Sequence, residues 1–293
     1  MINQTVDRFL ERVPFLEKGS TRAAALLHHA VLARGEPARE VADKLHGTWL
    51  GHPLHPVLTD VVVGAWMFGS FSDLVSAVDR SPQTARTADA LVALGTLAAV
   101  PTALSGLTDY STVPNPAASA GLSHGLLNSL ALTLYMMSLR ARQKGQRGKG
   151  ILLSTVGLAV ATAAAYLGGH LVYAKKVGTN HAEPAAEPVK WTPVLNERDL
   201  LEHNPARVEI EGNPVLLYRH GQLVHAVGAV CPHAGAPLEE GEVEGTHLQC
   251  PWHDSVFNLR NGEVVHGPAT FALPDYQARI MDGRVEVRLA KRT

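Results

Sequence analysis

Four long, mainly apolar stretches occupy the middle of the chain and limit what it can fold into. They run from Val57 to Val78, from Ala90 to Leu107, from Leu122 to Leu139 and from Ile151 to Tyr173. Each has about the 20 residues that an α-helix needs to cross a bilayer. Asp60 and Asp73 interrupt the first stretch, which keeps a soluble helical bundle as the alternative. From Ile151 to Leu167 there is neither a charge nor an amphipathic stripe, so we predict four membrane spans.

Small residues are frequent in these stretches, as in the run 161–165 and at Gly168 and Gly169. They allow helices in a membrane to approach closely, which predicts a compact four-helix bundle. The segment also resembles DUF2231, a bacterial membrane family of unknown function. The resemblance rests on H-P-L-H-P at 52–56, S-G-L-T-D-Y at 105–110, S-H-G-L-L-N at 123–128 and L-G-G-H-L-V-Y at 167–173. It implies an architecture and not an activity.

Several ionisable residues fall on one side of the predicted bundle. With four spans, the first and third begin on the side where the second and fourth end. His52, His55, Asp109, His124 and His170 therefore share one membrane face, where ionisable residues are costly and often functional. Two histidines from different spans could hold haem b, and His124 and His170 are the best candidates for it.

Other interpretations of this face stay open. A quinone site could use a histidine, such as His55, together with Asp60 as proton acceptors. A metal site could use His52 and His55. The structural alternative is that the His-Pro pairs form a rigid helix start and that the other histidines satisfy local hydrogen bonds. The candidates for a haem or quinone site are therefore His55, His124 and His170.

The chain has two cysteines, and each stands just before a histidine: Cys231 before His233, and Cys250 before His253. A mixed-ligand [2Fe-2S] centre needs this set, because two thiolates hold one iron and two imidazoles hold the other. Neutral imidazoles lower the negative charge around the cluster, so the histidine-bound iron takes the electron and the potential rises. Zinc sites usually pair Cys with Cys and His with His, and a disulfide would leave both histidines unexplained. We therefore expect electron transfer.

The region from about Trp191 to Arg288 resembles a Rieske domain. The resemblance rests on C-P-H-A-G-A-P-L at 231–238 and C-P-W-H-D-S-V-F at 250–257. It implies that Cys231 and Cys250 bind one iron and that His233 and His253 bind the other. The extra cysteines of quinol–cytochrome reductase Rieske proteins are missing from both motifs. The resemblance is therefore to the ferredoxin and oxygenase branch.

Three residues near the second motif bear on the reduction potential. The resemblance implies that Ser255 donates a hydroxyl hydrogen bond toward a cluster sulfur, which stabilises the reduced state. Phe257 stands where high-potential members have a tyrosine, and Asp254 adds a carboxylate close to the cluster. We therefore expect a potential in the low to middle part of the Rieske range of about −150 to +300 mV.

Short strands are predicted at 207–210, 215–219 and 222–227, with turns at Gly212-Asn213, Asn261-Gly262 and Asp282-Gly283. The expected fold class is multidomain: an α-helical transmembrane four-helix bundle plus an all-β Rieske-like iron–sulfur domain. The residues after His253 are expected to complete a small β-sandwich. They do not suit the mononuclear-iron domain of ring-hydroxylating oxygenases, so we do not expect an oxygenase by itself.

The chain is thus predicted to have four regions. They are amphipathic helices at 1–50, the four-span domain at 51–177, a linker at 178–190 and the Rieske domain at 191–293. The first helices are expected to lie on the membrane surface or to pack on the Rieske domain. No signal peptide is expected, because Met1 to Ser20 has no uninterrupted apolar core. The 26 basic and 27 acidic residues create no basic field for nucleic acid.

Two arguments about membrane orientation disagree. The loop between the third and fourth stretches carries Arg140, Arg142, Lys144, Arg147 and Lys149, which by the positive-inside rule would put the termini outside. Against this, an iron–sulfur domain is normally assembled in the cytosol, and no twin-arginine pair is present to export it folded. We favour a multi-pass protein of the bacterial cell membrane with a cytoplasmic Rieske domain.

The leading functional expectation is a membrane-anchored Rieske ferredoxin. It would pass single electrons between a redox partner protein and a carrier at or in the bilayer. A quinone- or haem-linked membrane oxidoreductase, with the cluster as its relay, is the first alternative. A redox or iron sensor is the second. No G-x-G-x-x-G motif for a nucleotide cofactor follows a predicted strand.

Overall fold

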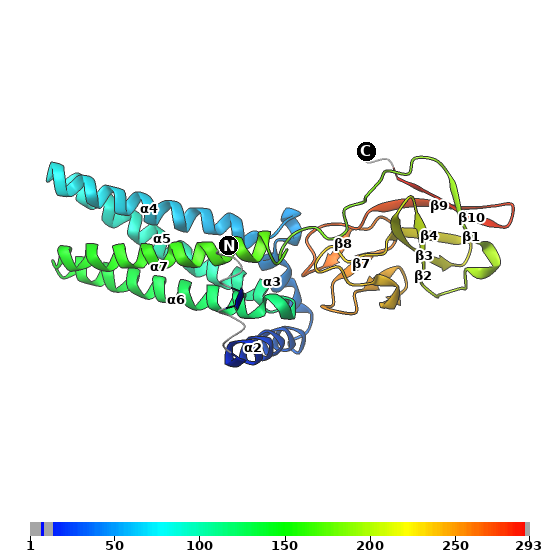
Figure 1. The fold of residues 1–293 in the computed structure, drawn as a ribbon, viewed down its shortest axis with the longest axis horizontal. Coiled ribbons are helices and arrows are strands. Elements are labelled where there is room, and N and C mark those ends of the chain that lie inside the picture. Colours follow the sequence, from blue (N-terminus) through cyan, green and yellow to red (C-terminus); the bar gives the residue numbers. More distant parts are fainter. Residues whose placement is uncertain (1–6, 9–13, 291–293) are drawn as a thin grey trace. The chain divides into compact units, whose positions relative to one another are not determined.

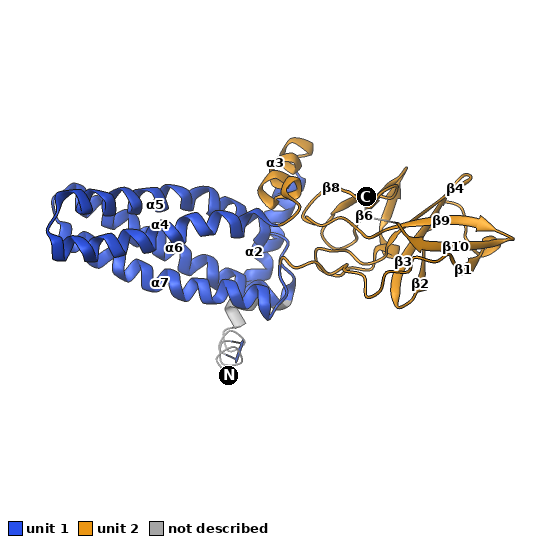
Figure 2. Ribbon diagram, turned by 90° about the horizontal axis from the view of Figure 1, so that it is seen from above, with its two compact units in different colours: residues 1–33, 53–177 blue, residues 34–52, 178–293 orange. Residues whose placement is uncertain are grey.

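The computed structural model describes residues 7–8 and 14–290, which form two units (Figures 1 and 2). The first unit, residues 1–33 and 53–177, is helical, and the second, residues 34–52 and 178–293, contains the strands. This confirms the expected combination of a helical bundle with an all-β domain. Part of the predicted amphipathic region, at 1–6 and 9–13, lies outside the described residues.

Four long helices build the first unit. They are α4 (Leu54–Asp79), α5 (Pro82–Tyr110), α6 (Asn115–Gln143) and α7 (Arg147–Tyr173), and the shorter α2 (Pro14–Leu32) packs beside them. Short connections make two helical hairpins, α4 with α5 and α6 with α7 (Figure 2). Ser81 caps α5 by accepting a hydrogen bond from the Thr84 amide, and Pro82 follows as the first helical residue.

Glycines let the helices pack closely. A Cβ atom at Gly95 in α5 would lie 2.4 Å from the Trp66 ring of α4, and one at Gly157 in α7 would lie 3.0 Å from Tyr135 of α6. The rings of Trp66 and Tyr135 stack at 3.9 Å with planes 7° apart, which joins the two hairpins. The compact bundle expected from the small residues is present.

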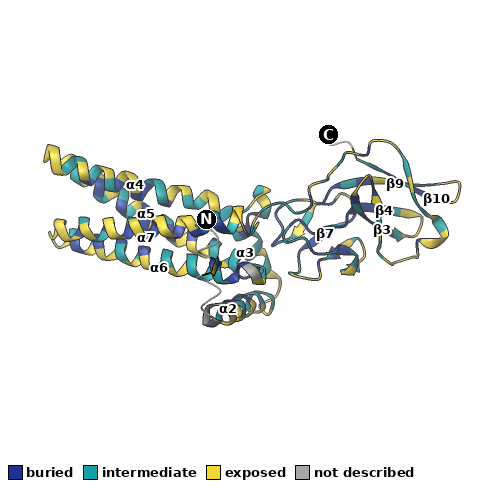
Figure 3. Cartoon of the chain, viewed as in Figure 1, coloured by how far each residue is buried: buried dark blue, intermediate teal, exposed yellow. Residues whose placement is uncertain are grey.

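Three of the four predicted spans are confirmed as helices long and apolar enough to cross a membrane. These are α4, α5 and α7 among the described residues. Large apolar side chains such as Phe68, Phe71 and Leu97 are exposed on them, as lipid contact requires. In Figure 3, exposed positions recur along the length of these helices. The remaining helix, α6, contains the predicted stretch from Leu122 to Leu139. It is more polar, because His124 and Asn128 interrupt its apolar run, and its membrane crossing stays a prediction.

A buried charge network holds all four long helices at one end of the bundle. Arg142 of α6 donates to Asp73 of α4 and Asp89 of α5, and Arg147 of α7 donates to the same two carboxylates. The side chains of Arg142 and Asp73 are 3% and 4% exposed. Such charges are tolerated in an apolar bundle only when they are paired, so this network explains why Asp73 interrupts the first apolar stretch.

The second unit contains two antiparallel sheets. The larger has the strand order β1-β10-β9-β4-β3-β2 and the smaller has the order β5-β6-β7-β8. Their bounds are β1 Thr192–Asn196, β2 Ala206–Ile210, β3 Asn213–His220, β4 Leu223–Gly228, β5 Glu242–Glu244, β6 His247–Gln249, β7 Val256–Asn258, β8 Val264–His266, β9 Asp275–Met281 and β10 Arg284–Leu289. Asp282 and Gly283 both have positive φ, which suits the tight turn that was predicted between β9 and β10.

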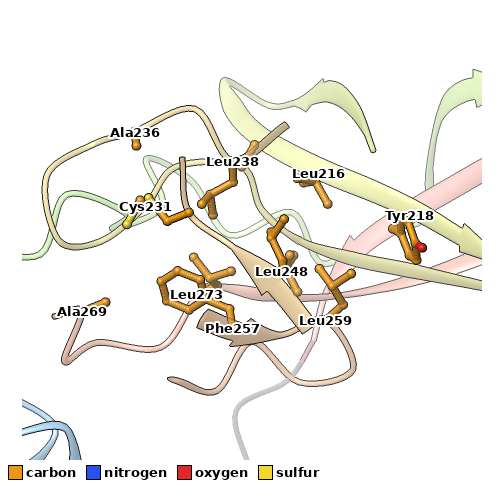
Figure 4. Packing of buried hydrophobic residues seen from close by; sticks show 13 residues of the cluster. Leu216, Tyr218, Cys231, Ala236, Leu238, Leu248, Phe257, Leu259, Ala269 and Leu273 are labelled. Atoms are coloured by element: carbon orange, nitrogen blue, oxygen red, sulfur yellow. The ribbon is translucent and has the colours of Figure 1, made fainter. Parts of the chain in front are cut away.

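Strand β3 is buried on both faces, and its alternating side chains enter two cores. Val215 and Leu217 enter a core that lies among β2, β9 and β10. Leu216 and Tyr218 enter the other core, which also contains both cysteines (Figure 4). In Figure 4, Cys231 lies at the end of this second core, beside Ala236 and Leu238. The loops that carry the cysteines are therefore anchored to the sheet by apolar packing.

Two short helices from early in the chain belong to the second unit. They are α3 (Glu36–His46) and the 3₁₀ turn η1 (Thr48–Leu50). Pro37 stands in the first turn of α3, and Gly47 ends the helix in the left-handed conformation. Of the two placements expected for the early helices, α3 takes the one on the β unit, beside β8.

Candidate functional site

The two cysteine motifs form a matched pair of loops. The first follows β4, and the Cys231 amide closes it by donating to the Ala236 carbonyl at 2.9 Å. The second joins β6 to β7, and the Cys250 amide closes it by donating to the Ser255 carbonyl at 2.8 Å. In both loops the amide of the cysteine reaches the carbonyl five residues later. Each loop thereby fixes one cysteine and one histidine.

The two thiols meet at the base of these loops. Cys231 and Cys250 are 1% and 2% exposed and are not joined by a disulfide. A hydrogen bond between the two sulfurs lowers the pKa of Cys250 to about 7, and the same bond together with burial raises the pKa of Cys231. Backbone amides also donate to the sulfurs: His233 and Ala234 to Cys231, and Trp252 and His253 to Cys250. These donors favour sulfur that carries negative charge.

The two histidine rings lie together at the outer end of the loops. Their centroids are 4.9 Å apart, and the planes of His233 and His253 are nearly perpendicular, at 86°. Both residues are half-buried, while Trp252 beside them is exposed. The structure therefore brings together the four residues that the sequence singled out, with the sulfurs inside and the imidazoles toward the surface.

A third loop, residues 267–270, closes the site beside the second motif. Ser255 is fully buried, and its Oγ accepts a hydrogen bond from the Ala269 amide at 3.0 Å. Since this bond uses a lone pair of the hydroxyl, the hydroxyl hydrogen is left to be donated elsewhere. Asp254 has a positive φ of 59°, and its carboxylate accepts from Gln249 at 2.6 Å. The Asp254 side chain is thus held by a neighbouring strand end.

Residues that the sequence gave no reason to connect with the site also reach these loops. Arg39 of α3 donates to the Asp254 carbonyl at 3.0 Å, and Asp43 accepts from the Gly267 amide at 2.8 Å. From the predicted linker, the His181 amide donates to the Pro232 carbonyl at 3.1 Å. A charged helix has many possible neighbours, so neither composition nor spacing in α3 could have indicated this contact.

The comparisons with known proteins agree with this geometry. Residues 190–277 match the family model described as Rieske [2Fe-2S] domain. The anthranilate 1,2-dioxygenase ferredoxin subunit of Burkholderia cepacia is 32% identical over 100 residues, which are 34% of this chain and 93% of that protein. The chain belongs to the Rieske [2Fe-2S] family. Residues 51–181 match a second family model, described as predicted membrane protein (DUF2231), so the Rieske domain is fused to a DUF2231 domain.

Two further relatives show how far the similarity extends. Apoptosis-inducing factor 3 of Homo sapiens is 31% identical over 122 residues, or 42% of this chain. The chain spans only 20% of that protein's length. Among solved structures, the ferredoxin of carbazole 1,9a-dioxygenase from Nocardioides aromaticivorans IC177 is 23% identical, with a TM-score of 0.33, and covers 34% of this chain and 99% of its own. Each similarity covers less than half of this chain.

The donor set of the Rieske site fits a [2Fe-2S] cluster. Two buried thiols, already surrounded by amide donors, supply soft ligands, and two adjacent imidazoles supply neutral ones. The Nδ1 atom of His253 is buried without a hydrogen bond, although its ring contacts that of His233. The family match points to the same cofactor.

The candidate histidines of the DUF2231 domain bond to other groups within the helical unit. His55 and His124 lie near each other, with ring centroids 6.2 Å apart. The Nδ1 atom of His55 donates to the Thr102 carbonyl at 2.9 Å, and that of His124 donates to the Ala164 carbonyl at 2.8 Å. His170 is paired instead with Asp7, at 3.0 Å.

These hydrogen bonds bear on the haem hypothesis. With Nδ1 of His124 bonded to a carbonyl, its Nε2 lies 3.1 Å from the Asn128 amide nitrogen and accepts from it. Both ring nitrogens of His124 are therefore in use, which does not fit an axial ligand to haem. The matched families add no support for haem or quinone. The structural alternative, in which these histidines satisfy local hydrogen bonds, accounts for the observed contacts.

Proposed function

We propose that this chain is a membrane-anchored Rieske protein that transfers single electrons. The observation that carries the proposal is the convergence of two loops. They place two buried, hydrogen-bonded thiols inside the domain and two imidazole rings, 4.9 Å apart, nearer the surface. A bound [2Fe-2S] cluster supplies one-electron chemistry, and mixed thiolate and imidazole ligation gives a potential above that of all-cysteine clusters.

Each residue of the site has a defined role in the proposal. Cys231 and Cys250 would hold one iron, and amide donors would offset the negative charge of their sulfurs. His233 and His253 would hold the other iron. Because both imidazoles are only half-buried, this arrangement suits electron exchange with a docked partner. Ser255, whose Oγ accepts from the Ala269 amide, would donate its hydroxyl hydrogen toward the cluster and would thereby stabilise the reduced state.

A redox protein is the partner that this site implies. The Burkholderia relative is named as the ferredoxin subunit of an anthranilate 1,2-dioxygenase. By analogy, the Rieske domain would receive an electron from one protein and deliver it to another. The DUF2231 domain would keep this exchange at the bilayer, because its three long apolar helices expose large hydrophobic side chains.

We further place the Rieske domain on the cytoplasmic side. The opposing argument relied on the basic residues at the end of α6, at the start of α7 and in the connection between them. Two of them, Arg142 and Arg147, are committed to the ion-pair network with Asp73 and Asp89. Fewer basic residues of this region are therefore left to interact with the lipid surface than the sequence alone suggests. Protease accessibility of the Rieske domain in inverted and right-side-out membrane vesicles tests this placement.

The proposed function is tested by spectroscopy of the full chain purified in detergent. Electron paramagnetic resonance of the dithionite-reduced protein should show a Rieske signal, with about two irons per chain and no haem absorption. Haem bands that reduce together with the signal would favour the alternative of a haem-linked oxidoreductase. A cluster that no physiological donor reduces would favour a sensor. Absence of an iron–sulfur signal after reconstitution would overturn the proposal.

A further inference from the structure

Two acidic side chains attach the helix α3 to the third loop of the Rieske site and to the strand end before it. Asp43 Oδ1 accepts from the Gly267 amide at 2.8 Å, and Asp43 Oδ2 lies 2.8 Å from Nδ1 of His266. Glu36, one residue into the same helix, lies 3.2 Å from the other nitrogen of His266. The last residue of β8 and the first residue of the loop are thus held by acidic side chains from a segment that is more than 200 residues away in the chain.

The contact is also sterically close. A Cβ atom at Gly267 would lie 3.1 Å from Thr48, 3.3 Å from Asp43 and 3.4 Å from His46. The loop therefore fits closely against α3 and η1, and a side chain at position 267 would require these neighbours to shift by a few tenths of an ångström. Asp43 is further fixed through its own backbone, because its carbonyl accepts from the Gly47 amide and from the Thr48 hydroxyl. This carboxylate is part of a rigid helix end.

The third loop, which Asp43 holds at Gly267, also makes a hydrogen bond to Ser255. Two residues after Gly267, the Ala269 amide donates to Ser255 Oγ, and both residues are buried. The position of this amide determines which lone pair of the hydroxyl is occupied, and so where the hydroxyl hydrogen can point. Any movement of Gly267 would be transmitted over only two peptide units to the hydroxyl.

The same helix reaches the second loop independently. Arg39, one helical turn before Asp43, donates to the carbonyl of Asp254, the residue that follows His253 and has the left-handed conformation. Consequently α3 holds the backbone at two places near Ser255. One is Asp254, the residue before Ser255, and the other is Gly267, two residues before the Ala269 amide that donates to the Ser255 hydroxyl. These two hydrogen bonds, one to each of two loops of the same site, indicate that α3 does more than cover the surface of the domain.

We propose that α3 is a built-in part of the cluster site and that Asp43 is a positioning residue, which sets the cluster's potential by fixing Gly267 and, through Ala269, the hydroxyl of Ser255. This inference rests on the proposed function, because it requires the cluster to bind between the two loops. It assigns a redox role to a segment that precedes the first membrane helix.

Two effects of Asp43 on the potential have opposite signs, and this makes the inference testable. Removing a carboxylate near the cluster would by itself raise the potential, since the reduced state is the more negative one. Loss of the Ser255 hydrogen bond would lower the potential. If Asp43 acts by positioning, Asp43→Ala must lower the potential in spite of the lost negative charge.

The experiment compares variants of the full chain in detergent, by redox titration of the Rieske signal. The variants are Asp43→Ala, Asp43→Asn, Ser255→Ala, the double variant of Asp43→Ala with Ser255→Ala, and Glu40→Ala as the control. Glu40 is an exposed acid on the same helix, so its loss removes an equal charge from α3. Hydrogen exchange of the peptide that covers 264–270 is followed in parallel, as a measurement that does not depend on electron-transfer activity.

The inference predicts a pattern across these variants. Asp43→Ala lowers the midpoint potential, Asp43→Asn retains most of it because an amide oxygen still accepts from Gly267, and Glu40→Ala does not lower it. The double variant has the potential of Ser255→Ala alone, because both changes remove the same hydrogen bond. Exchange in 264–270 rises about tenfold or more in Asp43→Ala, as expected for the loss of two hydrogen bonds.

Failure of the inference and failure of the proposed function give different results. An unchanged or raised potential in Asp43→Ala, with a normal Rieske signal in the unsubstituted chain, overturns the role of Asp43 alone. Additive effects in the double variant overturn the route through Ser255. If the unsubstituted chain shows no Rieske signal after reconstitution, the proposed function fails instead. If Asp43→Ala does not fold, Asp43→Asn with the exchange measurement decides the question.

Discussion

The two domains use polar groups in opposite ways. In the Rieske domain, two thiols and two imidazoles from two loops converge on one place, and each loop is closed by a backbone hydrogen bond of its own. In the DUF2231 domain, the charged side chains of the network and the histidines bond to one another or to carbonyls, as Arg142 does with Asp73 and His124 does with Ala164. A binding site gathers its ligand side chains from separate loops at one place, whereas charges inside an apolar bundle are tolerated when they are paired.

The largest expected effect tests this contrast directly. Replacing Cys250 by Ser, or His253 by Ala, removes an iron ligand, and we expect complete loss of the Rieske signal and of bound iron. His124→Ala and His170→Ala in the bundle are expected to leave both unchanged. His247→Gln, an exposed histidine three residues before Cys250, is the control for nonspecific damage. Loss of the signal in His124→Ala would show that the two domains are not functionally separate in this way.

The second prediction concerns the charge network of the bundle. Arg142→Ala leaves the carboxylate of Asp73 buried and paired only with Arg147, which should destabilise the bundle by about 3–5 kcal/mol. Arg140→Ala, an exposed arginine on the same helix, should change stability by less than about 0.5 kcal/mol. Unfolding in mixed micelles, followed by circular dichroism, measures both. Equal stability of the two variants would mean that the network is not structural.

Helix packing in the bundle should give a smaller effect. Gly95→Ala places a Cβ atom 2.4 Å from Trp66, and the required shift of the stacked ring should cost about 1–3 kcal/mol. Gly64→Ala is the matched control, because nothing lies within 4 Å of its Cβ position, and it should be neutral or slightly stabilising. Thermal unfolding in detergent compares them, and the cluster signal should persist in each. A stable Gly95→Ala protein would contradict the close packing.

The sequence was sufficient for the local features of both domains. Spacing and residue type predicted the two motifs, and the structure brings Cys231, Cys250, His233 and His253 together. Apolar length predicted the long helices, and the membrane crossing of α6, whose apolar run is interrupted by His124 and Asn128, stays a prediction. Asp73 looked like evidence against a membrane span until its partners on other helices were known.

The contacts of α3 could not be predicted for a general reason. A carboxylate or guanidinium on an amphipathic helix has the same local signature whether it faces solvent or a loop more than 200 residues away. Only the folded arrangement distinguishes Arg39 and Asp43, which bond to the Rieske loops, from Glu40 between them, which is exposed. Long-range polar contacts of this kind leave no periodic pattern in the sequence.

The smallest predicted effect separates charge from position within α3. Arg39→Gln keeps a side chain that can donate to the Asp254 carbonyl but removes a positive charge near the cluster. Because a nearby cation favours the more negative reduced state, the potential should fall by about 20 mV, equivalent to about 0.5 kcal/mol at a partly exposed position. Glu40→Gln removes a charge of the opposite sign from the same helix and should shift the potential slightly upward. Both shifts should shrink as salt is added, because they act through solvent that screens charge, whereas the shift from Asp43→Ala should not. A salt-independent fall in Arg39→Gln would instead mean that the hydrogen bond to Asp254 orders the second loop, and α3 would then act on both loops by position alone.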